Sequence, residues 1–221
     1  MSCMLPKNIA FVDIETTGLS ASLNRIIEIG IVRVEENQIV NTFHSLINPG
    51  TYIPKVITDI TGITPNEVKH APSFGSLQDD ITEILNDCVF VAHNVQFDYS
   101  FIKSEFKREG KIFSSKKFCT VRLSRHLFPT QPRHNLDAII ERFDLLCQAR
   151  HRALGDAQVL VDFYNKLQQQ FTEEELSIAI TTSMKRRNKA VKHFLSENKD
   201  HQKSNDDKSA TSNNQEVLII G

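Results

Sequence analysis

Apolar residues in the first 50 positions fall into short runs separated by turn-forming residues. Three runs rich in Ile, Val and Phe predict β-strands, each closed by Gly, Asn or Pro: NIAFVDIE (8–15), RIIEIGIVRVEEN (25–37) and QIVNTFHSLINPG (38–50). The connections between them are short, as at EENQ, which favours pairing between antiparallel neighbours. We therefore predict that the fold begins with an antiparallel meander of three strands.

From residue 74 onward the spacing of apolar residues changes to the period of an α-helix. Apolar residues at intervals of three and four predict helices at 74–85, 97–109, 134–143 and 154–170. Two short apolar segments predict further strands, CVFVAHN (88–94) and FCT (118–120), and helical turns are expected at 121–127. Three strands followed by alternating helices and strands indicate an α/β protein with helices on a mixed sheet.

The chain changes character after residue 172, so we divide it into three parts. Residues 1–172 form the predicted core domain. Residues 173–195 are predicted as an amphipathic helical extension, acidic at its start and basic later, as the helix dipole favours. Residues 196–216 contain no apolar side chain larger than alanine, so 196–221 is predicted as a disordered polar tail that ends in VLIIG.

Composition narrows the class of protein. The net charge of −1 argues against binding duplex DNA through bulk positive charge, although it permits a local contact. The four cysteines are scattered without a CxxC pair, which predicts neither a disulfide framework nor a zinc site. The start of the chain lacks the features of a signal peptide, and no stretch approaches the ~20 apolar residues of a membrane span. We therefore expect a cytoplasmic protein without membrane partners.

Two acidic residues interrupt the first predicted strand, at FVDIETTG (11–18). Alternate side chains of a strand share one face, so Asp13 and Glu15 project together while Val12 and Ile14 point to the other side. An unpaired buried carboxylate is destabilising, which suggests that the pair binds a ligand. Gly18, in the TTG that follows, lets backbone amides approach such a ligand.

Three further residues with metal-site chemistry stand at the ends of predicted elements. Asp98 lies in the first turn of a helix, just after the polar pair His93–Asn94, and Asp156 opens the last helix, five residues after His151. Helix capping is a sufficient explanation for either aspartate alone. Taken as a set, four carboxylates and a histidine at strand ends and helix starts indicate a site of the kind that α/β sheets build there.

Converging carboxylates repel one another unless cations lie between them. Oxygen ligands of this kind favour Mg²⁺ or Mn²⁺ over zinc. Two such ions about 3.5–4 Å apart are an arrangement used for phosphodiester hydrolysis. A histidine with a pKa near neutrality suits the general base that deprotonates water. The residues therefore predict a site for two divalent cations, Mg²⁺ or Mn²⁺, with phosphodiester hydrolysis as its chemistry.

Three stretches of the chain resemble the exonuclease motifs of the DnaQ-like DEDDh family of 3′–5′ exonucleases, in the same order: FVDIETTG, HNVQFD and HRALGDA. Supporting stretches match at RIIEIGIVRV, ITGIT and HNLDAI, so that the resemblance covers residues 8 to 170. Within the family the chain most resembles the proofreading epsilon subunit of bacterial DNA polymerase III and its free-standing relatives. The resemblance implies a ribonuclease H-like exonuclease fold, in which a mixed five-stranded sheet with three antiparallel strands first is flanked by helices.

The resemblance also implies a role for each residue of the set. Asp13, Glu15 and Asp156 would hold the cation that carries the nucleophile. Asp13 would bridge to the second cation, which Asp98 would support, and His151 would be the general base. Histidine in place of tyrosine assigns the DEDDh branch. Contacts with the substrate are expected from Glu15, Thr16, Gly18, Leu19, Thr61, Asn94, Phe97 and His151. Thr61 stands where the epsilon subunit has a histidine, which alters the expected contacts at the 3′ end.

The implied activity is removal of nucleotides from the 3′ end of single-stranded DNA, in proofreading or repair. Water would attack the last phosphodiester in line and release nucleoside 5′-monophosphates. Two alternatives stay open: the same chemistry on RNA or short oligonucleotides, and an adaptor that keeps the fold and tethers a polymerase. We also hypothesise that the tail, at Val217–Ile220, docks on a DNA polymerase subunit or sliding clamp. Deleting residues 196–221 and measuring polymerase or clamp capture would test that contact.

Overall fold

The computed structural model of the protein describes residues 5–184. The three segments predicted as a meander form β1 (Asn8–Thr16), β2 (Ile26–Glu35) and β3 (Gln38–Leu46), which pair antiparallel in sequence order. Glu36 and Asn37 connect β2 to β3 and have positive φ angles of 46° and 68°. A two-residue turn of this kind matches the twist of the strands that it joins, so the predicted meander is confirmed.

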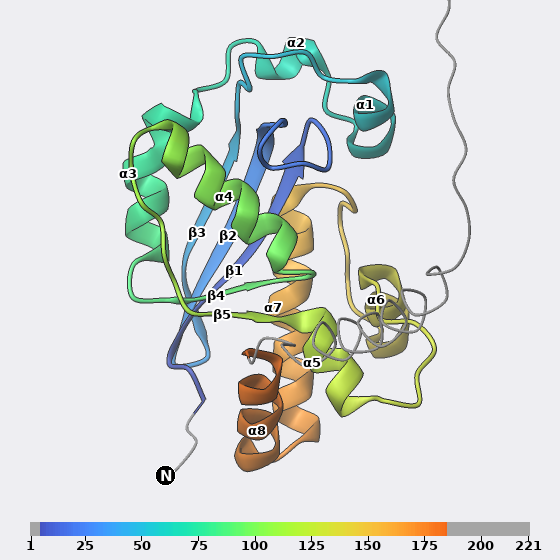
Figure 1. Ribbon diagram of the computed structural model, residues 1–221. Coiled ribbons are helices and arrows are strands. Elements are labelled where there is room, and N and C mark those ends of the chain that lie inside the picture. The colour runs from blue at the N-terminus through green and yellow to red at the C-terminus, as the bar shows by residue number, and fades with distance from the viewer. Residues whose placement is uncertain (1–4, 185–221) are drawn as a thin grey trace, which may run out of the picture. The chain divides into compact units, whose positions relative to one another are not determined.

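Two later strands complete the sheet on the other side of β1. β4 (Val89–Ala92) pairs parallel with β1, and β5 (Lys117–Cys119) pairs parallel with β4. The strand order is therefore β3-β2-β1-β4-β5, with β1 in the centre (Figure 1). This confirms the predicted fold class, a mixed five-stranded sheet with three antiparallel strands first, flanked by helices.

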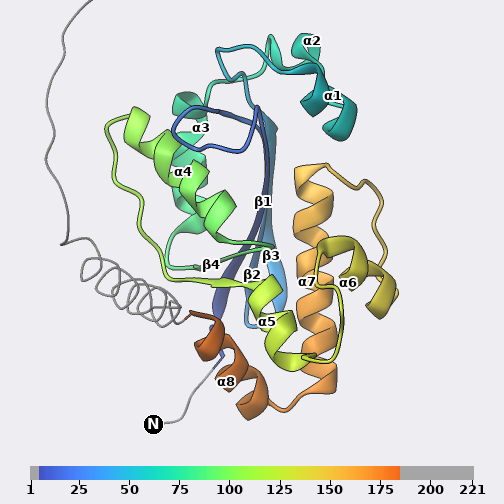
Figure 2. The same cartoon turned by 45° about the vertical axis from the view of Figure 1, so that its right-hand side comes forward.

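Helices cover both faces of the sheet (Figure 2). They are α3 (Phe74–Leu85), α4 (Gln96–Arg108), α5 (Thr120–Leu127), α6 (Leu136–Phe143) and α7 (Ala153–Gln170). Because side chains alternate along β1, Ala10 and Val12 pack into the core formed with α3 and α4. Ile9 and Phe11 pack into the opposite core, formed with α6 and α7. The central strand is therefore apolar on both faces until it reaches Asp13.

Two short helices were not predicted from the sequence, α1 (Lys55–Thr61) and α2 (Pro65–Val68). α2 begins with a capping box, in which the Thr64 hydroxyl accepts a hydrogen bond from Glu67 N at 3.3 Å and the Glu67 carboxylate accepts one from Thr64 N at 2.7 Å. The segment that contains them packs Ile53, Ile63 and Val68 against Ile27 of β2, and these four residues form a small buried apolar cluster. A core of this size is enough to hold two helices that are too short to show a periodic pattern.

The final described helix, α8 (Glu173–Met184), forms the first half of the predicted extension. It buries Leu176, Ala179 and Ile180 in the core on the α7 side of the sheet. The rest of the predicted extension and the predicted tail, residues 185–221, lie outside the described residues, so these predictions and the predicted polymerase or clamp contact are untested. No helix within residues 5–184 is long and apolar enough to cross a membrane; the cytoplasmic location stays a prediction.

Candidate metal and active site

Gly30 of β2 allows the first turn of α7 to lie directly against the sheet. It is paired with Asp13 of β1, and a Cβ atom at position 30 would lie 2.4 Å from the carbonyl carbon of Ala153. Any side chain larger than hydrogen would therefore push α7 away. Because Asp156 stands in that first turn, this glycine brings Asp156 close to the end of β1 that carries Asp13 and Glu15.

Glu15, His151 and Asp156 meet at this point. Each offers one ligand atom, and the three atoms lie within 4.8 Å of one another. Asp156 is buried, and its Oδ1 has no hydrogen-bond partner among the described residues. A buried carboxylate oxygen without a donor is destabilising unless a cation binds it. This geometry, and the all-oxygen chemistry of the carboxylates, fits a hard divalent cation.

Asp98 belongs to the same group, although it comes from a different helix. It lies in the first turn of α4, and 3% of the residue is exposed. Its charge is near enough to Asp13 to raise the pKa of that carboxyl group. The structure thus places ligand atoms of Glu15, His151 and Asp156 within 4.8 Å of one another, and Asp13 and Asp98 near enough to interact with this group through their charges. Their individual roles stay predictions.

Burial raises the pKa of every carboxyl group in this cluster, and repulsion between carboxylates adds to it for Asp13, Glu15 and Asp98. The pKa of Asp13 lies well above its ordinary value, first through burial and then through the charges of Asp98, Asp156 and Glu15. Burial, followed by the charge of Asp156, raises the pKa of Glu15 to about 7. Burial raises the pKa of Asp98 to about 8 and also raises that of Asp156. Without a cation, part of the cluster is therefore protonated near neutral pH.

Arg150, which was not predicted as a site residue, compensates part of the negative charge. Its guanidinium forms an ion pair with Asp156 through Nη1 and a second with Asp137, whose Oδ1 lies 2.7 Å from Arg150 Nε. The Asp156 ion pair opposes the effect of burial on the pKa of that carboxyl group. The sequence offered one signal for this role, the position of Arg150 directly before His151. A single arginine in a loop is too common for that position to predict a site residue.

Glu28, fully buried within β2, holds the segment that follows His151. Its carboxylate accepts hydrogen bonds from Arg152 Nη2 at 2.7 Å and Ala153 N at 2.9 Å, and it contacts His44 Nε2 at 2.8 Å. Burial opposes the ionisation of Glu28, but these hydrogen bonds outweigh it and hold the pKa below its ordinary value. His151 itself is exposed, with a φ of 59°. Glu28 was missed, although an acid inside the apolar run RIIEIGIV is a recognisable signal.

Two predicted substrate contacts, Thr16 and Thr61, have hydroxyls that are already used within the fold. Thr16 is buried and donates from Oγ1 to the carbonyl oxygen of Gly18 at 2.7 Å. Thr61 is also buried, and its Oγ1 donates to Ile57 O at 2.9 Å and accepts from Ile63 N at 3.1 Å. Both side chains stabilise local backbone, and their contacts with a substrate stay predictions.

The other predicted substrate contacts are more accessible. Leu19 is 88% exposed in the loop after β1, and Asn94 is exposed at the start of α4 with a φ of 74°. Phe97 is half-buried and packs against Phe101, with 4.9 Å between ring centroids. Leu19 and Asn94 are therefore free to contact a ligand, whereas Phe97 already contributes to the core on the α4 side.

Comparison with protein families identifies one matching model. The Exonuclease family model, RNase_T, matches residues 10–164, which include the four carboxylates and the histidine of the candidate site. The chain is 38% identical over 161 residues to "DNA polymerase III PolC-type" of Caldanaerobacter subterraneus and 37% identical over 165 residues to "3′-5′ exonuclease DinG" of Staphylococcus epidermidis. These alignments cover 73% and 72% of this chain, but 12% and 18% of the relatives. The chain thus spans less than a fifth of the length of these relatives.

Solved structures share the same architecture. "Exonuclease X in complex with 5′ overhanging duplex DNA" superimposes with a TM-score of 0.59 at 27% identity, covering 78% of this chain and 99% of that one. The nuclease domain of 3′hExo, "a DEDDh family member, bound to rAMP", gives a TM-score of 0.65 at 18% identity, covering 76% and 95%. At that identity the second likeness shows the fold alone.

Proposed function

Because this chain belongs to the exonuclease family that the RNase_T model describes, as its three motifs predicted, we propose that it is a metal-dependent 3′–5′ exonuclease. It hydrolyses the terminal phosphodiester of single-stranded DNA and releases nucleoside 5′-monophosphates. The observation that carries this proposal is the buried, unpartnered Oδ1 of Asp156, beside Glu15 and the exposed His151.

The carboxylates of this chain are suited to hold two divalent cations, Mg²⁺ or Mn²⁺. Asp13, Glu15 and Asp156 would hold the first ion, and Asp13 and Asp98 would hold the second. Support comes from the raised pKa values of the group, which reflect burial together with too little positive charge among the surrounding residues. When bound, such ions lower the pKa of water and stabilise charge on the leaving oxygen.

His151 takes the proton from the attacking water. Its ring lies within 4.8 Å of ligand atoms of Glu15 and Asp156, and it is exposed, so that a water molecule and a phosphate can reach it. The water oxygen bonds to phosphorus while the bond from phosphorus to the 3′ oxygen of the preceding nucleotide breaks. The proton goes to the imidazole, and the released 3′ oxygen takes a proton from solvent. Glu28 keeps the backbone after His151 in place through Arg152 and Ala153.

The names of similar proteins favour DNA over RNA as the substrate. The two sequence relatives described above are named as a DNA polymerase III and a 3′–5′ exonuclease, and the structure of Exonuclease X contains DNA. A role in proofreading or repair, with a polymerase as partner, is consistent with the PolC-type relative. RNA or short oligonucleotides as substrates, and an adaptor without activity, are outcomes that the following experiment separates.

The test is mononucleotide release from 5′-labelled single-stranded DNA and from RNA of the same sequence, with Mg²⁺, Mn²⁺ or EDTA. We expect stepwise shortening from the 3′ end with either ion, none with EDTA, and faster release from DNA. Faster release from RNA would replace the proposed substrate. No release from either nucleic acid under any condition would contradict the nuclease proposal and favour the adaptor.

A His151→Ala variant should release mononucleotides about a hundredfold more slowly, because a positioned general base contributes roughly 10²–10⁴ to the rate. Its Mn²⁺ affinity, measured by titration calorimetry, should change little, since the carboxylates remain. A His126→Ala variant, which removes a solvent-facing histidine from α5, is the matched control and should retain the wild-type rate. An undiminished rate in His151→Ala would remove this residue from the mechanism.

A further inference from the structure

The loop between β1 and β2, residues 17–24, presents two large apolar side chains to solvent. Leu19 is 88% exposed and Leu23 is 82% exposed. Single exposed leucines are common on protein surfaces, but these two stand on a short loop that begins two residues after Glu15. A mobile loop would be free to fold such side chains back onto the protein, so the question is what holds this one in place.

Hydrogen bonds within the loop close it at its base and across its tip. Thr17 N donates to Arg25 O at 2.9 Å, and Arg25 N donates to Thr17 Oγ1 at 3.0 Å. At the tip, Ser20 N donates to Asn24 Oδ1 at 3.0 Å, and Asn24 N donates to Ser20 O at 2.7 Å. The loop therefore has a defined conformation before any ligand binds.

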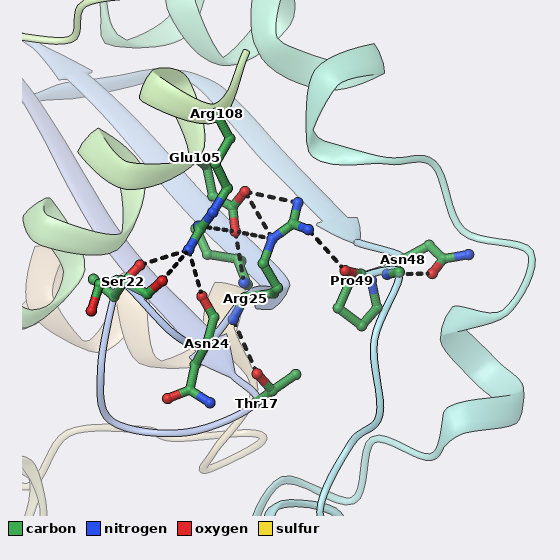
Figure 3. A network of polar contacts seen from close by, with 11 residues as sticks. Thr17, Ser22, Asn24, Arg25, Asn48, Pro49, Glu105 and Arg108 are labelled. Carbon is green, nitrogen blue, oxygen red and sulfur yellow. Dashed lines mark hydrogen bonds and ion pairs between the residues drawn. The ribbon is translucent and has the colours of Figure 1, made fainter. Parts of the chain in front are cut away.

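Arg108, in the last turn of α4, also holds this loop through hydrogen bonds from its side chain. Its Nη2 donates to three loop carbonyl oxygens, those of Ala21 at 2.9 Å, Ser22 at 3.2 Å and Asn24 at 3.3 Å. Figure 3 shows the guanidinium reaching across from α4 to the loop. The two hydrogens of this nitrogen are shared among three backbone acceptors that would otherwise be left to water.

Glu105, one turn earlier on α4, fixes the position of Arg108. It is 1% exposed, and its Oε1 lies 3.2 Å from Arg108 Nη1. The same carboxylate binds Arg25 at the base of the loop, through Nε at 2.9 Å and Nη2 at 2.9 Å, and accepts from Ile26 N at 3.3 Å. Arg25 Nη1 donates in turn to Pro49 O at 3.1 Å. Glu105 therefore lies between Arg108, which contacts carbonyl oxygens of residues 21, 22 and 24, and Arg25, which directly follows the loop (Figure 3).

We propose that Arg108 and Glu105 are positioning residues that hold loop 17–24 so that Leu19 and Leu23 pack against the bases at the 3′ end of single-stranded DNA. The inference rests on the proposed function for the identity of the ligand. A loop that is already ordered loses little conformational entropy when a ligand binds, whereas a loose loop must be ordered by the ligand at the expense of affinity. Loss of the contacts that Arg108 and Glu105 make with the loop therefore raises KM and leaves kcat nearly unchanged.

The test compares Arg108→Met, which keeps the length of the side chain and removes its donors, with wild type. Lys107→Met is the matched control, because Lys107 is the exposed neighbour on α4 and its loss removes the same charge. For Arg108→Met we expect KM for 5′-labelled oligothymidylate to rise about tenfold, kcat to stay within about twofold, and amide hydrogen exchange to accelerate in residues 17–24. For Lys107→Met we expect KM within about twofold of wild type and unchanged exchange.

A KM for Arg108→Met equal to that of Lys107→Met, or unchanged exchange in residues 17–24, would overturn the proposal. Leu23→Ser tests the contact of Leu23 with the bases separately from the positioning of the loop. It should raise KM severalfold without accelerating hydrogen exchange at the Thr17 amide. A Leu23→Ser variant with wild-type KM would remove Leu23 from the contact. If wild type itself releases no nucleotide, the proposed function fails. Fluorescence anisotropy of labelled oligothymidylate with Ca²⁺ then tests the positioning role of Arg108. Weaker binding by Arg108→Met than by wild type would support this role, and equal binding would overturn it.

Discussion

An Asp13→Asn variant should lose at least about a thousandfold in the rate of mononucleotide release, while its metal-free form unfolds at a higher temperature than metal-free wild type. A thousandfold corresponds to about 4 kcal/mol of transition-state stabilisation. This is the scale expected if Asp13 has the role that we propose, an anionic ligand shared by two cations. The amide keeps the shape of the side chain and loses its charge. It therefore removes repulsion with Asp98, Asp156 and Glu15, the charges that raise the pKa of Asp13.

Two measurements check this expectation. Release of mononucleotides from labelled DNA with Mg²⁺ gives the rate, and thermal unfolding with EDTA or Mg²⁺ gives the stability of both forms. Asp79→Asn serves as the control, because this aspartate is exposed and forms only a surface ion pair with Lys111 at 2.8 Å. The control should change neither quantity appreciably. A wild-type rate in Asp13→Asn, or a metal-free form that is less stable than wild type, would show that Asp13 has no part in binding the cations.

The carboxylates of the site could be predicted from the sequence because their signals are local. Strand geometry alone places Asp13 and Glu15 on one face, and the helix pattern alone places Asp98 and Asp156 in first turns. The same reasoning shows why the site forms where it does. β1 is apolar on both faces up to Val12. From Asp13 onward the face that carries Ile9 and Phe11 becomes acidic, while Ile14 continues the core on the other face.

The residues that hold the site in place could not be predicted in this way. Glu28 meets Arg152 across 124 positions of the sequence, and Glu105 meets Arg25 across 80. No periodic pattern relates such partners, and only the packing of α7 and α4 on the sheet brings them together. Arg150 is similar, since its pairing with Asp137 depends on how the loop before α7 folds back.

The segment between β3 and α3 was missed for a different reason. α1 and α2 are too short to display a helical period, and their apolar residues are few. The capping box at Thr64 and Glu67 was the available signal. Thr61 was assigned from the resemblance alone, and the structure shows its hydroxyl engaged at the end of α1. Its contact with a substrate stays a prediction.

Metal-free protein should lose stability as the pH rises from about 5 to about 8, by about 3–5 kcal/mol, and Mg²⁺ should abolish most of this loss. The folded-state pKa of Glu15 is about 7, against an ordinary value of 4.5, and that of Asp98 is about 8, against 3.8. Between the two values of each group the folded protein binds a proton that the unfolded chain has released. Stability therefore falls with rising pH through this window, because only the folded state still holds these protons, and the fall levels off above each folded-state pKa.

His93 and Glu28 also have shifted pKa values, and their contributions decide in which pH range the fall in stability is easiest to measure. His93 has a pKa lowered to about 4, chiefly by burial, so its contribution to stability increases up to about pH 6.5 and offsets part of the fall below that pH. Glu28, with its lowered pKa, contributes stability that is fully present above its ordinary value of 4.5 and is constant across the window. The decline should therefore be clearest above pH 6.5, where the raised pKa of Asp98 dominates.

The measurement is urea unfolding at several pH values between about 5 and 8, once with EDTA and once with saturating Mg²⁺. Cations keep the carboxylates ionised at all these pH values, so the two curves should separate progressively as the pH rises, with protons released on Mg²⁺ binding. An Asp98→Asn variant should make the metal-free curve shallower above pH 7, because it removes one buried carboxyl group with a raised pKa and its repulsion of Asp13. Metal-free stability that is level or increasing between pH 6.5 and 8 would mean that these carboxylates do not form the repulsive cluster on which the metal site depends.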